Sequence, residues 1–313
     1  MMDILDRVPE QAYKGGKSGT TAALGFFDGL HLGHIAVIER ALSPGMRLCV
    51  LSVGEPYTVA SGGAVRSTRI IPKSEELRIL SGLGTDMLIQ PPFESFRDMS
   101  GKRFVREVIV GRLGADAVSC GEDFRFGKDA ACGVDELRAM GEKYGFECRV
   151  CPQISIDGEK VSSTRLRALL TEGRIAGANR LLGRLYGYTI PVVPGLHLAR
   201  TLGAPTINQP LPEDLYPMRC GVYASRTMLG GKWMYSVTNI GVKPTITGGT
   251  RTQPLSETWI PDFSGDLYGE SIRVELVDFI RDERVFDSVE QLGEAIHRDG
   301  ETAKRIASEF TAP

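Results

Sequence analysis

Apolar positions follow different patterns in the two halves of the chain. Between residues 20 and 151, short apolar runs typical of buried strands alternate with segments whose apolar positions recur every three or four residues, as in helices. The expected strands cover residues 21–24, 46–53, 87–90, 117–120 and 148–151, and the expected helices cover residues 35–42, 74–83, 100–112 and 134–144. This alternation predicts an α/β domain in which helices cover both faces of a parallel sheet. In such a sheet, ligands bind at the carboxyl ends of the strands.

Another pattern begins near residue 186, after two helical segments that end near residues 170 and 182. Short apolar runs separated by Gly, Pro and Asn take over, and the expected strands cover residues 188–193, 221–228, 233–240 and 271–279. Closely spaced strands with this punctuation predict a small antiparallel β-barrel. A capping box at residues 288–291 predicts a helix over residues 288–297, and a second one is expected over 301–310. We therefore expect two domains, residues 1–185 and residues 186–313.

Composition and charge exclude several classes of protein. The 313 residues are 42% apolar and 24% charged, and a formal net charge of −2 without a basic block argues against nucleic-acid binding. No window reaches the roughly 18 apolar residues of a membrane span, so we expect a cytoplasmic protein without a membrane partner. An oligomer is possible, but no feature of the sequence indicates one.

Six cysteines are spread too thinly for a disulfide framework, in agreement with a reducing compartment. Cys148 and Cys151 form a C-x-x-C pattern, which raises the question of zinc or redox chemistry. A strand over these residues would point the two thiols to opposite faces, and no second pair of ligands accompanies them. We therefore do not expect a metal site there.

Residues 25–34, Gly-Phe-Phe-Asp-Gly-Leu-His-Leu-Gly-His, join an expected strand to an expected helix. Such a junction offers unpaired backbone N–H groups and the positive end of a helix dipole, which together favour a phosphate. His31 and His34 are three residues apart, so their imidazoles would lie on one side of the first turn, and Gly33 leaves room for a ligand. The alternative is that these histidines only cap or pack the helix. Two of the chain's four histidines lie here, which favours the phosphate site.

Two further segments of the first half carry candidate chemistry. Residues 121–127 follow an expected strand, so Asp123 and Arg125 stand at the carboxyl edge of the sheet, although a solvated ion pair is the alternative. Residues 161–167 place three hydroxyl side chains one turn before Arg167. One of these serines could simply cap a helix, but hydroxyl donors followed by an arginine are better suited to holding a triphosphate.

The second half has its own candidates. Thr206 and Asn208 lie two residues apart in an expected turn, and their oxygens suit a magnesium ion and phosphate groups. A plain proline turn is the alternative. Glu257 stands on an expected strand, where a carboxylate facing a nucleotide could accept a proton from a hydroxyl nucleophile. Most glutamates are solvated surface charges, so Glu257 alone carries little weight.

Taken together, these motifs resemble the prokaryotic bifunctional riboflavin kinase/FAD synthetase family. The His-x-Gly-His pattern after a strand is similar to that of the nucleotidyltransferase superfamily. The matching segments follow the family's order over nearly the whole chain, at residues 25–34, 121–127, 162–167, 202–208, 221–224, 238–241, 243–245, 257 and 266–269. The resemblance implies a Rossmann-like FMN adenylyltransferase domain followed by a β-barrel riboflavin kinase domain. It also implies ATP, riboflavin, FMN and FAD as ligands, and Mg²⁺ as the metal.

The resemblance further implies roles for individual residues. The implied catalytic residues are Glu257, His31, His34, Asp123 and Arg167. The implied nucleotide-binding residues are Gly25, Phe27, Asp28, Gly33, Ser162, Ser163, Thr164, Gly195, Arg200, Gly203 and Pro205. Asn239, Asp266 and Tyr268 are implied to bind the flavin, and Thr206 and Asn208 to bind the metal.

The chain departs from the family pattern at several positions. Relatives usually carry a Thr-Phe-Asp-Pro-His-Pro-like segment where residues 51–57 read Leu-Ser-Val-Gly-Glu-Pro-Tyr. Ala199, Ala204 and Trp259 stand where relatives often have Gly, Phe and His. Two alternatives to a bifunctional enzyme therefore stay open. One is a descendant with a single activity, a riboflavin kinase with weak or absent FAD synthesis, and the other is a non-catalytic flavin-binding regulator.

Overall fold

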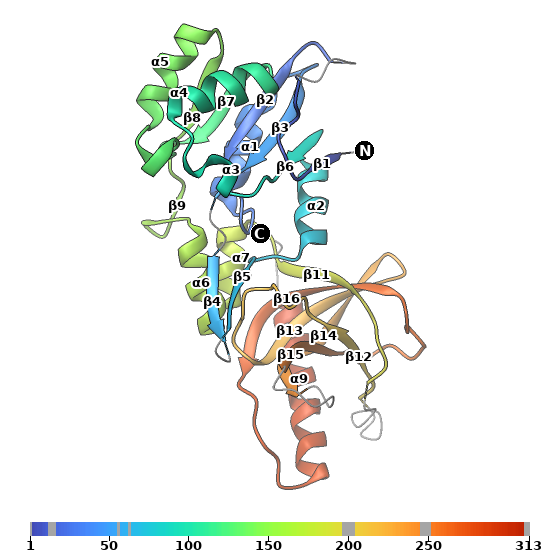
Figure 1. The fold of residues 1–313 in the computed structure, drawn as a ribbon. Helices are drawn as coiled ribbons and strands as arrows, with labels where there is room; N and C mark the ends of the chain where they lie inside the picture. Colours follow the sequence, from blue (N-terminus) through green and yellow to red (C-terminus); the bar gives the residue numbers. More distant parts are fainter. Residues whose placement is uncertain are drawn as a thin grey trace. The chain divides into compact units, whose positions relative to one another are not determined.

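The computed structural model describes residues 2–11, 17–54, 57–61, 64–195, 204–244 and 252–309. The chain forms two compact units (Figure 1). The first comprises Met1–Pro56 and Glu76–Ser162, and the second comprises Tyr57–Glu75 and Ser163–Pro313. The boundary near residue 185 stays a prediction about where the two activities separate.

A six-stranded parallel sheet forms the centre of the first unit, as predicted. Its strands lie in the order β1 (Asp3–Leu5), β6 (Met87–Ile89), β3 (Arg47–Ser52), β2 (Thr20–Gly25), β7 (Ala115–Gly121) and β8 (Glu147–Cys151). From β2 the chain continues to β3 on one side of it, whereas β7 pairs with the other side. The carboxyl end of β2 is therefore the switch point of the sheet, where α/β proteins bind ligands.

Helices pack on the sheet because its strands are apolar on both faces. The helical segments of this part of the chain are α1 (Leu32–Ala41), α2 (Lys73–Gly82), α3 (Glu94–Arg97), α4 (Gly101–Arg103), η1 (Phe104–Arg112), η2 (Lys128–Ala130) and α5 (Val134–Tyr144). Residues of η1 and α5 share an apolar core with β2, β3, β6 and β7, and α1 packs on β2, β7 and β8. The helix predicted over residues 100–112 exists, but η1 has π-helical hydrogen bonding. A short hairpin, β9 (Ser155–Ile156) and β10 (Glu159–Lys160), was not predicted.

The predicted placement of the C-x-x-C thiols is confirmed. Cys148 joins the apolar core that η1 and α5 cover, whereas the Cys151 thiol donates a hydrogen bond to the Ala36 carbonyl of α1, at 3.2 Å. No group of three or more His, Cys, Asp or Glu side chains in the described ranges is arranged to hold a metal.

An antiparallel six-stranded sheet forms the second unit's barrel, which confirms the predicted fold class. Its strands lie in the order β11 (Tyr186–Pro191), β16 (Ser271–Arg281), β13 (Gly221–Leu229), β14 (Lys232–Pro244), β15 (Thr252–Trp259) and β12 (Thr206–Pro210). The edge strands meet because the Val193 N–H donates to the Asn208 carbonyl at 2.8 Å. The prediction that residues 203–208 form a turn is wrong from Thr206 onward, because pairing with β15 extends this segment into a strand.

The interior of this barrel contains a continuous chain of buried hydroxyl groups. Neighbouring oxygens are 2.6 to 3.4 Å apart along Tyr188, Ser256, Thr258, Thr238, Ser225, Ser236 and Thr227. All seven residues are at most 1% exposed. Hydrogen bonding to one another satisfies groups that would otherwise be costly to bury.

Helices α6 (Ser163–Glu172), α7 (Ile175–Leu182) and α9 (Val289–Glu309) and a hairpin of β4 (Tyr57–Ser61) and β5 (Ala64–Thr68) complete the second unit. Helix α9 packs on β13, β14 and β16. The prediction of two separate terminal helices is wrong, because α9 continues through Gly300. A Cβ atom at Gly300 would lie 2.8 Å from Cζ3 of Trp259, so this glycine lets the helix approach the indole closely.

Candidate functional site

The β2–α1 junction brings the two predicted histidines together. His31 is the N-cap of α1, and its Nδ1 accepts a hydrogen bond of 3.3 Å from the backbone N–H of His34. The two imidazole rings stack with their centroids 3.7 Å apart. Because Nδ1 of His31 is an acceptor, neutral His31 carries its proton on Nε2. A Cβ on Gly33 would lie 3.2 Å from Cε1 of His31, so the glycine keeps this turn open.

The turn that precedes α1 is strained. Gly29 and Leu30 have φ values of 89° and 46°, and Leu30 is fully buried. A bulky residue with positive φ is costly and persists where the surrounding structure enforces it, often at a functional site. Phe27 is held behind the turn, because its N–H donates to Oγ of Ser52 at 3.2 Å and its ring meets His34 edge-on at 5.4 Å. Asp28 is also largely buried here, at 9% exposure.

The loop after β7 lies at the same edge of the sheet, because β7 pairs with β2. Asp123 forms a close ion pair with Lys160 of β10, a residue that the sequence motifs did not single out. Arg125 instead folds back on its own loop and donates to the Ala130 carbonyl at 3.1 Å. The structure therefore presents Asp123 with a cationic partner at the end of β7.

The hydroxyl motif of residues 162–167 falls at the start of α6. Ser162 is the last residue of the first unit, whereas Ser163 and Thr164 begin the helix in the second unit. Arg167 lies one turn further on and is 6% exposed, with its guanidinium over the ring of Tyr216 and Cζ 5.7 Å from the ring centroid.

Three adjacent strands of the barrel carry the second set of candidates. Glu257 of β15 lies opposite Asn208 of β12 on one side and opposite Asn239 of β14 on the other. Directly opposed residues share a face of a sheet, so these three side chains form a row. Thr206 is two residues from Asn208 and belongs to the same face. The Asn239 amide also donates to Oε1 of Glu283 at 3.2 Å, a contact that sequence motifs did not reveal.

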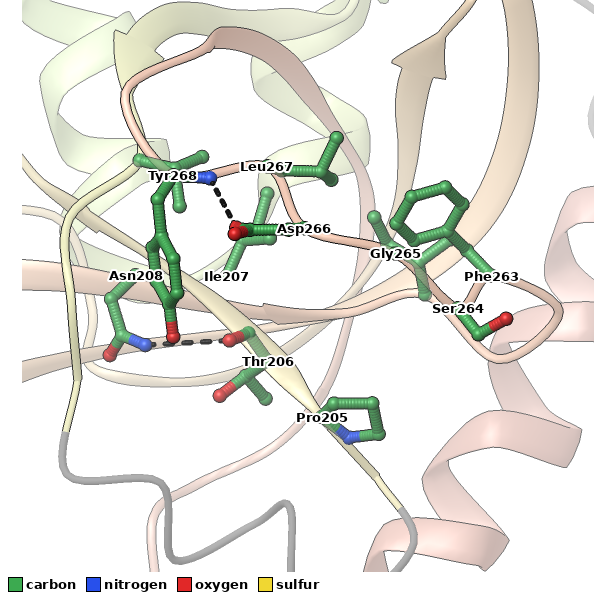
Figure 2. A pocket seen from close by; sticks show the side chains of 12 residues that line it. Pro205, Thr206, Ile207, Asn208, Phe263, Ser264, Gly265, Asp266, Leu267 and Tyr268 are labelled. Carbon is green, nitrogen blue, oxygen red and sulfur yellow. Dashed lines mark hydrogen bonds between the residues drawn. The ribbon is translucent and has the colours of Figure 1, made fainter.

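A pocket of about 370 Å³ opens beside this row (Figure 2). Its lining includes Thr206 and Asn208 from β12, Pro205 just before that strand, and Asp266 and Tyr268 from the loop before β16. Asp266 shapes that loop by accepting the backbone N–H of Tyr268 at 3.0 Å. The structure thus brings two predicted flavin-binding residues into the same pocket as the predicted metal pair. Arg200 and Gly203 lie outside the described residues.

Thr206 and Asn208 have the chemistry of a site for a hard divalent cation. The Asn208 amide nitrogen faces the Thr206 carbonyl oxygen (Figure 2). The distance between these two atoms is 3.5 Å, and Asn208 is 6% exposed. Its Oδ1 atom is buried and has no hydrogen-bond partner among the described residues. A buried amide oxygen without a donor, on the same strand face as a threonine hydroxyl two residues away, has the chemistry of a site for an oxygen-ligated cation such as Mg²⁺. Gly195 packs directly against this amide.

A strand–helix junction with two histidines in a parallel sheet, together with a carboxylate in a row with two amides on a barrel, is the arrangement expected of an enzyme that transfers groups from nucleotides. Family models agree: residues 14–165 match FAD synthetase, and residues 182–307 match riboflavin kinase. The chain belongs to the bifunctional riboflavin kinase/FMN adenylyltransferase family.

Curated relatives support this assignment over nearly their whole lengths. The bifunctional riboflavin kinase/FMN adenylyltransferase of Pseudomonas fluorescens is 33% identical over 93% of this chain and 94% of its own. The enzyme of the same description from Bacillus subtilis is 32% identical over 96% of both chains. A solved structure described as a macrolide-efflux protein from Streptococcus pneumoniae has a TM-score of 0.81 and 25% identity, with coverage of 97% of this chain and 99% of its own.

The predicted function is therefore confirmed. The protein phosphorylates riboflavin to FMN with ATP and then adenylylates FMN to FAD, and a divalent metal is required. No finding favours the single-activity or regulator alternatives. Its ligands are riboflavin, FMN, FAD and ATP, with no indication of a nucleic-acid or membrane partner. Within the described part of the chain, no helix combines the length and apolar character needed to cross a bilayer.

Proposed function

We propose that the two reactions use separate residue sets, and that the kinase uses the row of Asn208, Glu257 and Asn239 with Thr206. The observation that carries this proposal is the strand register, which puts a carboxylate between two amides, with Thr206 on the same face two residues from Asn208. A phosphoryl transfer to an alcohol needs such a combination, because the alcohol must lose a proton while the phosphate charge is neutralised.

In the kinase reaction, Glu257 accepts the proton of the riboflavin 5′-hydroxyl as its oxygen attacks the γ-phosphorus of ATP. The bond between the γ-phosphorus and the bridging oxygen breaks, and ADP leaves. Thr206 and Asn208 hold Mg²⁺, which supplies charge neutralisation at the phosphates when it is bound. Gly195, Arg200, Gly203 and Pro205 bind the nucleotide in this proposal.

Asn239, Asp266 and Tyr268 are proposed to bind the flavin. Asn239 lies directly opposite Glu257, next to the expected position of the reacting hydroxyl. Asp266 and Tyr268 line the same pocket as Thr206 and Asn208, so a flavin held there would lie beside the proposed metal ligands.

In adenylylation, the FMN phosphate is already a competent nucleophile, so positioning and charge neutralisation matter more than a base. An FMN phosphate oxygen attacks the α-phosphorus of ATP, and pyrophosphate leaves. We assign His31, His34 and Asp123 to this reaction as catalytic residues, with Arg167 as a phosphate ligand. Gly25, Phe27, Asp28, Gly33, Ser162, Ser163 and Thr164 are proposed to shape nucleotide binding. The stacked imidazoles at the N-terminus of α1 support this assignment.

Two variants test the separation of the residue sets. Glu257→Gln should abolish FMN formation from riboflavin while leaving conversion of FMN to FAD, because only the first reaction needs the base. His31→Ala should do the reverse. Chromatography of products from riboflavin or FMN, each with ATP and Mg²⁺, measures both reactions. Equal loss of both activities in either variant would contradict separate residue sets.

The domain boundary and location are also proposals. Residues 186–313 are proposed to carry the kinase, and residues 1–185 the adenylyltransferase. Because α6, α7 and the β4–β5 hairpin are grouped with the barrel, a fragment of residues 186–313 should be compared with one of residues 163–313. A folded fragment of residues 186–313 without riboflavin kinase activity would contradict the boundary.

The six free cysteines support a cytoplasmic location, which fractionation of the source cells can test.

A further inference from the structure

Arg167 is held by an aromatic residue from a distant part of the sequence. Its guanidinium lies over the Tyr216 ring, with 5.7 Å between Cζ and the ring centroid, and its side chain is 6% exposed. A cation in this position is attracted to the π-face, and burial strengthens the attraction. Tyr216 is not part of any motif that the sequence singled out.

Tyr216 is itself fixed at both ends. Its hydroxyl lies 3.1 Å from Oγ1 of Thr171, which is four residues after Arg167 and therefore on the same face of α6. Its backbone N–H donates to the Arg69 carbonyl at 2.8 Å. The ring thus spans one turn of α6, from the arginine to the threonine.

Hydrogen bonds also hold residues 214–219, the segment around Tyr216, against the C-terminal end of α6. Arg219 donates its backbone N–H to the Leu170 carbonyl and a guanidinium N–H to the Glu172 carbonyl, both at 3.0 Å. Asp214 accepts from the Arg69 side chain at 2.8 Å. These bonds satisfy carbonyls at the helix end and fix residues 214–219 against α6.

We propose that Tyr216 is a positioning residue for FMN adenylylation, which holds the Arg167 guanidinium in the orientation that binds a phosphate. This inference rests on the proposed role of Arg167. A free arginine side chain samples many rotamers, and its ordering is costly at the moment of binding. Stacking on a fixed ring restricts those rotamers before the nucleotide arrives, which favours the transition state.

Removal of the ring should be tolerated by the fold. Tyr216 lines an existing cavity of about 220 Å³, together with Leu215, Met218 and Ile240. Tyr216→Leu therefore enlarges a cavity that is already present. Tyr216→Phe keeps the ring and loses only the hydroxyl contact, which Thr171→Val removes from the other side.

The test compares these variants in the full-length protein. Tyr216→Leu should lower kcat/KM for FMN adenylylation roughly tenfold, the scale of a partly buried cation–π contact, whereas Tyr216→Phe and Thr171→Val should stay within about twofold of the wild type. Riboflavin phosphorylation by the same preparation reports on folding. A double-mutant cycle supplies the specific readout, because Tyr216→Leu should have no further effect when Arg167 is already alanine.

Each other result contradicts a defined part of the inference. Wild-type adenylylation in Tyr216→Leu, equal loss of both activities, or effects that add to those of Arg167→Ala would overturn the positioning role. Normal FAD synthesis by Arg167→Ala would instead remove the proposed role of Arg167 itself. It would overturn the positioning inference with it, even if Tyr216→Leu were impaired.

Discussion

Replacement of Gly195 by alanine is expected to disable the kinase through Asn208. A Cβ at position 195 would lie 2.6 Å from Cγ and 2.8 Å from Oδ1 of Asn208, and closer still to Nδ2. Ordinary contact begins at 3.4 Å, so the amide must move by about 1 Å. The Asn208 backbone is held by the bond from Val193, so the side chain has to rotate. A displacement near 1 Å at a positioning group costs about 100-fold in rate.

The assay is riboflavin phosphorylation at a series of Mg²⁺ concentrations, followed by conversion of FMN to FAD with the same preparation. We expect Gly195→Ala to lower kcat for the kinase between about 10-fold and 100-fold and to raise the Mg²⁺ requirement, with adenylylation retained. Gly82→Ala is the matched control, because a Cβ there meets nothing within 4 Å. Wild-type kinase activity and metal dependence in Gly195→Ala would refute the assignment of Asn208 as a metal ligand.

Substitutions at three further positions address the metal, the histidine cap and helix α9. Thr206→Ala should raise the Mg²⁺ concentration for half-maximal riboflavin phosphorylation, because an oxygen ligand is lost, and an unchanged titration would contradict its metal role. His31→Ala and His31→Asn should both lose adenylylation. Only the alanine variant should have a lower free energy of unfolding in urea, by about 1 kcal/mol, because asparagine can still cap α1. Equal stability of the two variants would contradict the role of His31 as the helix cap. Gly300→Ala should lower the melting temperature, because overpacking against Trp259 costs about 1–3 kcal/mol whereas the gain in helix propensity is only about 1 kcal/mol. A higher melting temperature would show that the indole moves aside.

The predictions succeeded where local pattern and local chemistry agree. The segment Gly25 to His34 follows a buried strand and precedes an amphipathic helix, so its position at the sheet edge was predictable. The strained φ of Leu30 and the stacking of the imidazoles were not, because both depend on packing around the turn. Lys160 and Tyr216 carry no local signal of their roles, since each meets its partner only after folding.

The failures have particular physical causes. Thr206 and Asn208 follow Gly203 and Pro205, which read as a turn, but pairing with a strand almost fifty residues away extends them into β12. The break expected between residues 297 and 301 is absent, because α9 continues through Gly300, whose lack of a side chain allows the close approach to Trp259. The β4–β5 hairpin had an available signal, because Gly-Gly at residues 62 and 63 separates two short runs rich in β-branched residues.

The hydroxyl chain inside the barrel has a consequence for the fidelity of folding. Ser256 and Thr258 point into the barrel and Glu257 points out, so a shift of β15 by one residue would exchange them. Such a shift would bury the carboxylate among hydroxyl groups and leave the interior network with missing partners. The network therefore penalises a misalignment that would turn Glu257, the proposed base, from the outer face of the barrel to its interior. Seven interior residues thus help to determine which face of β15 presents this carboxylate.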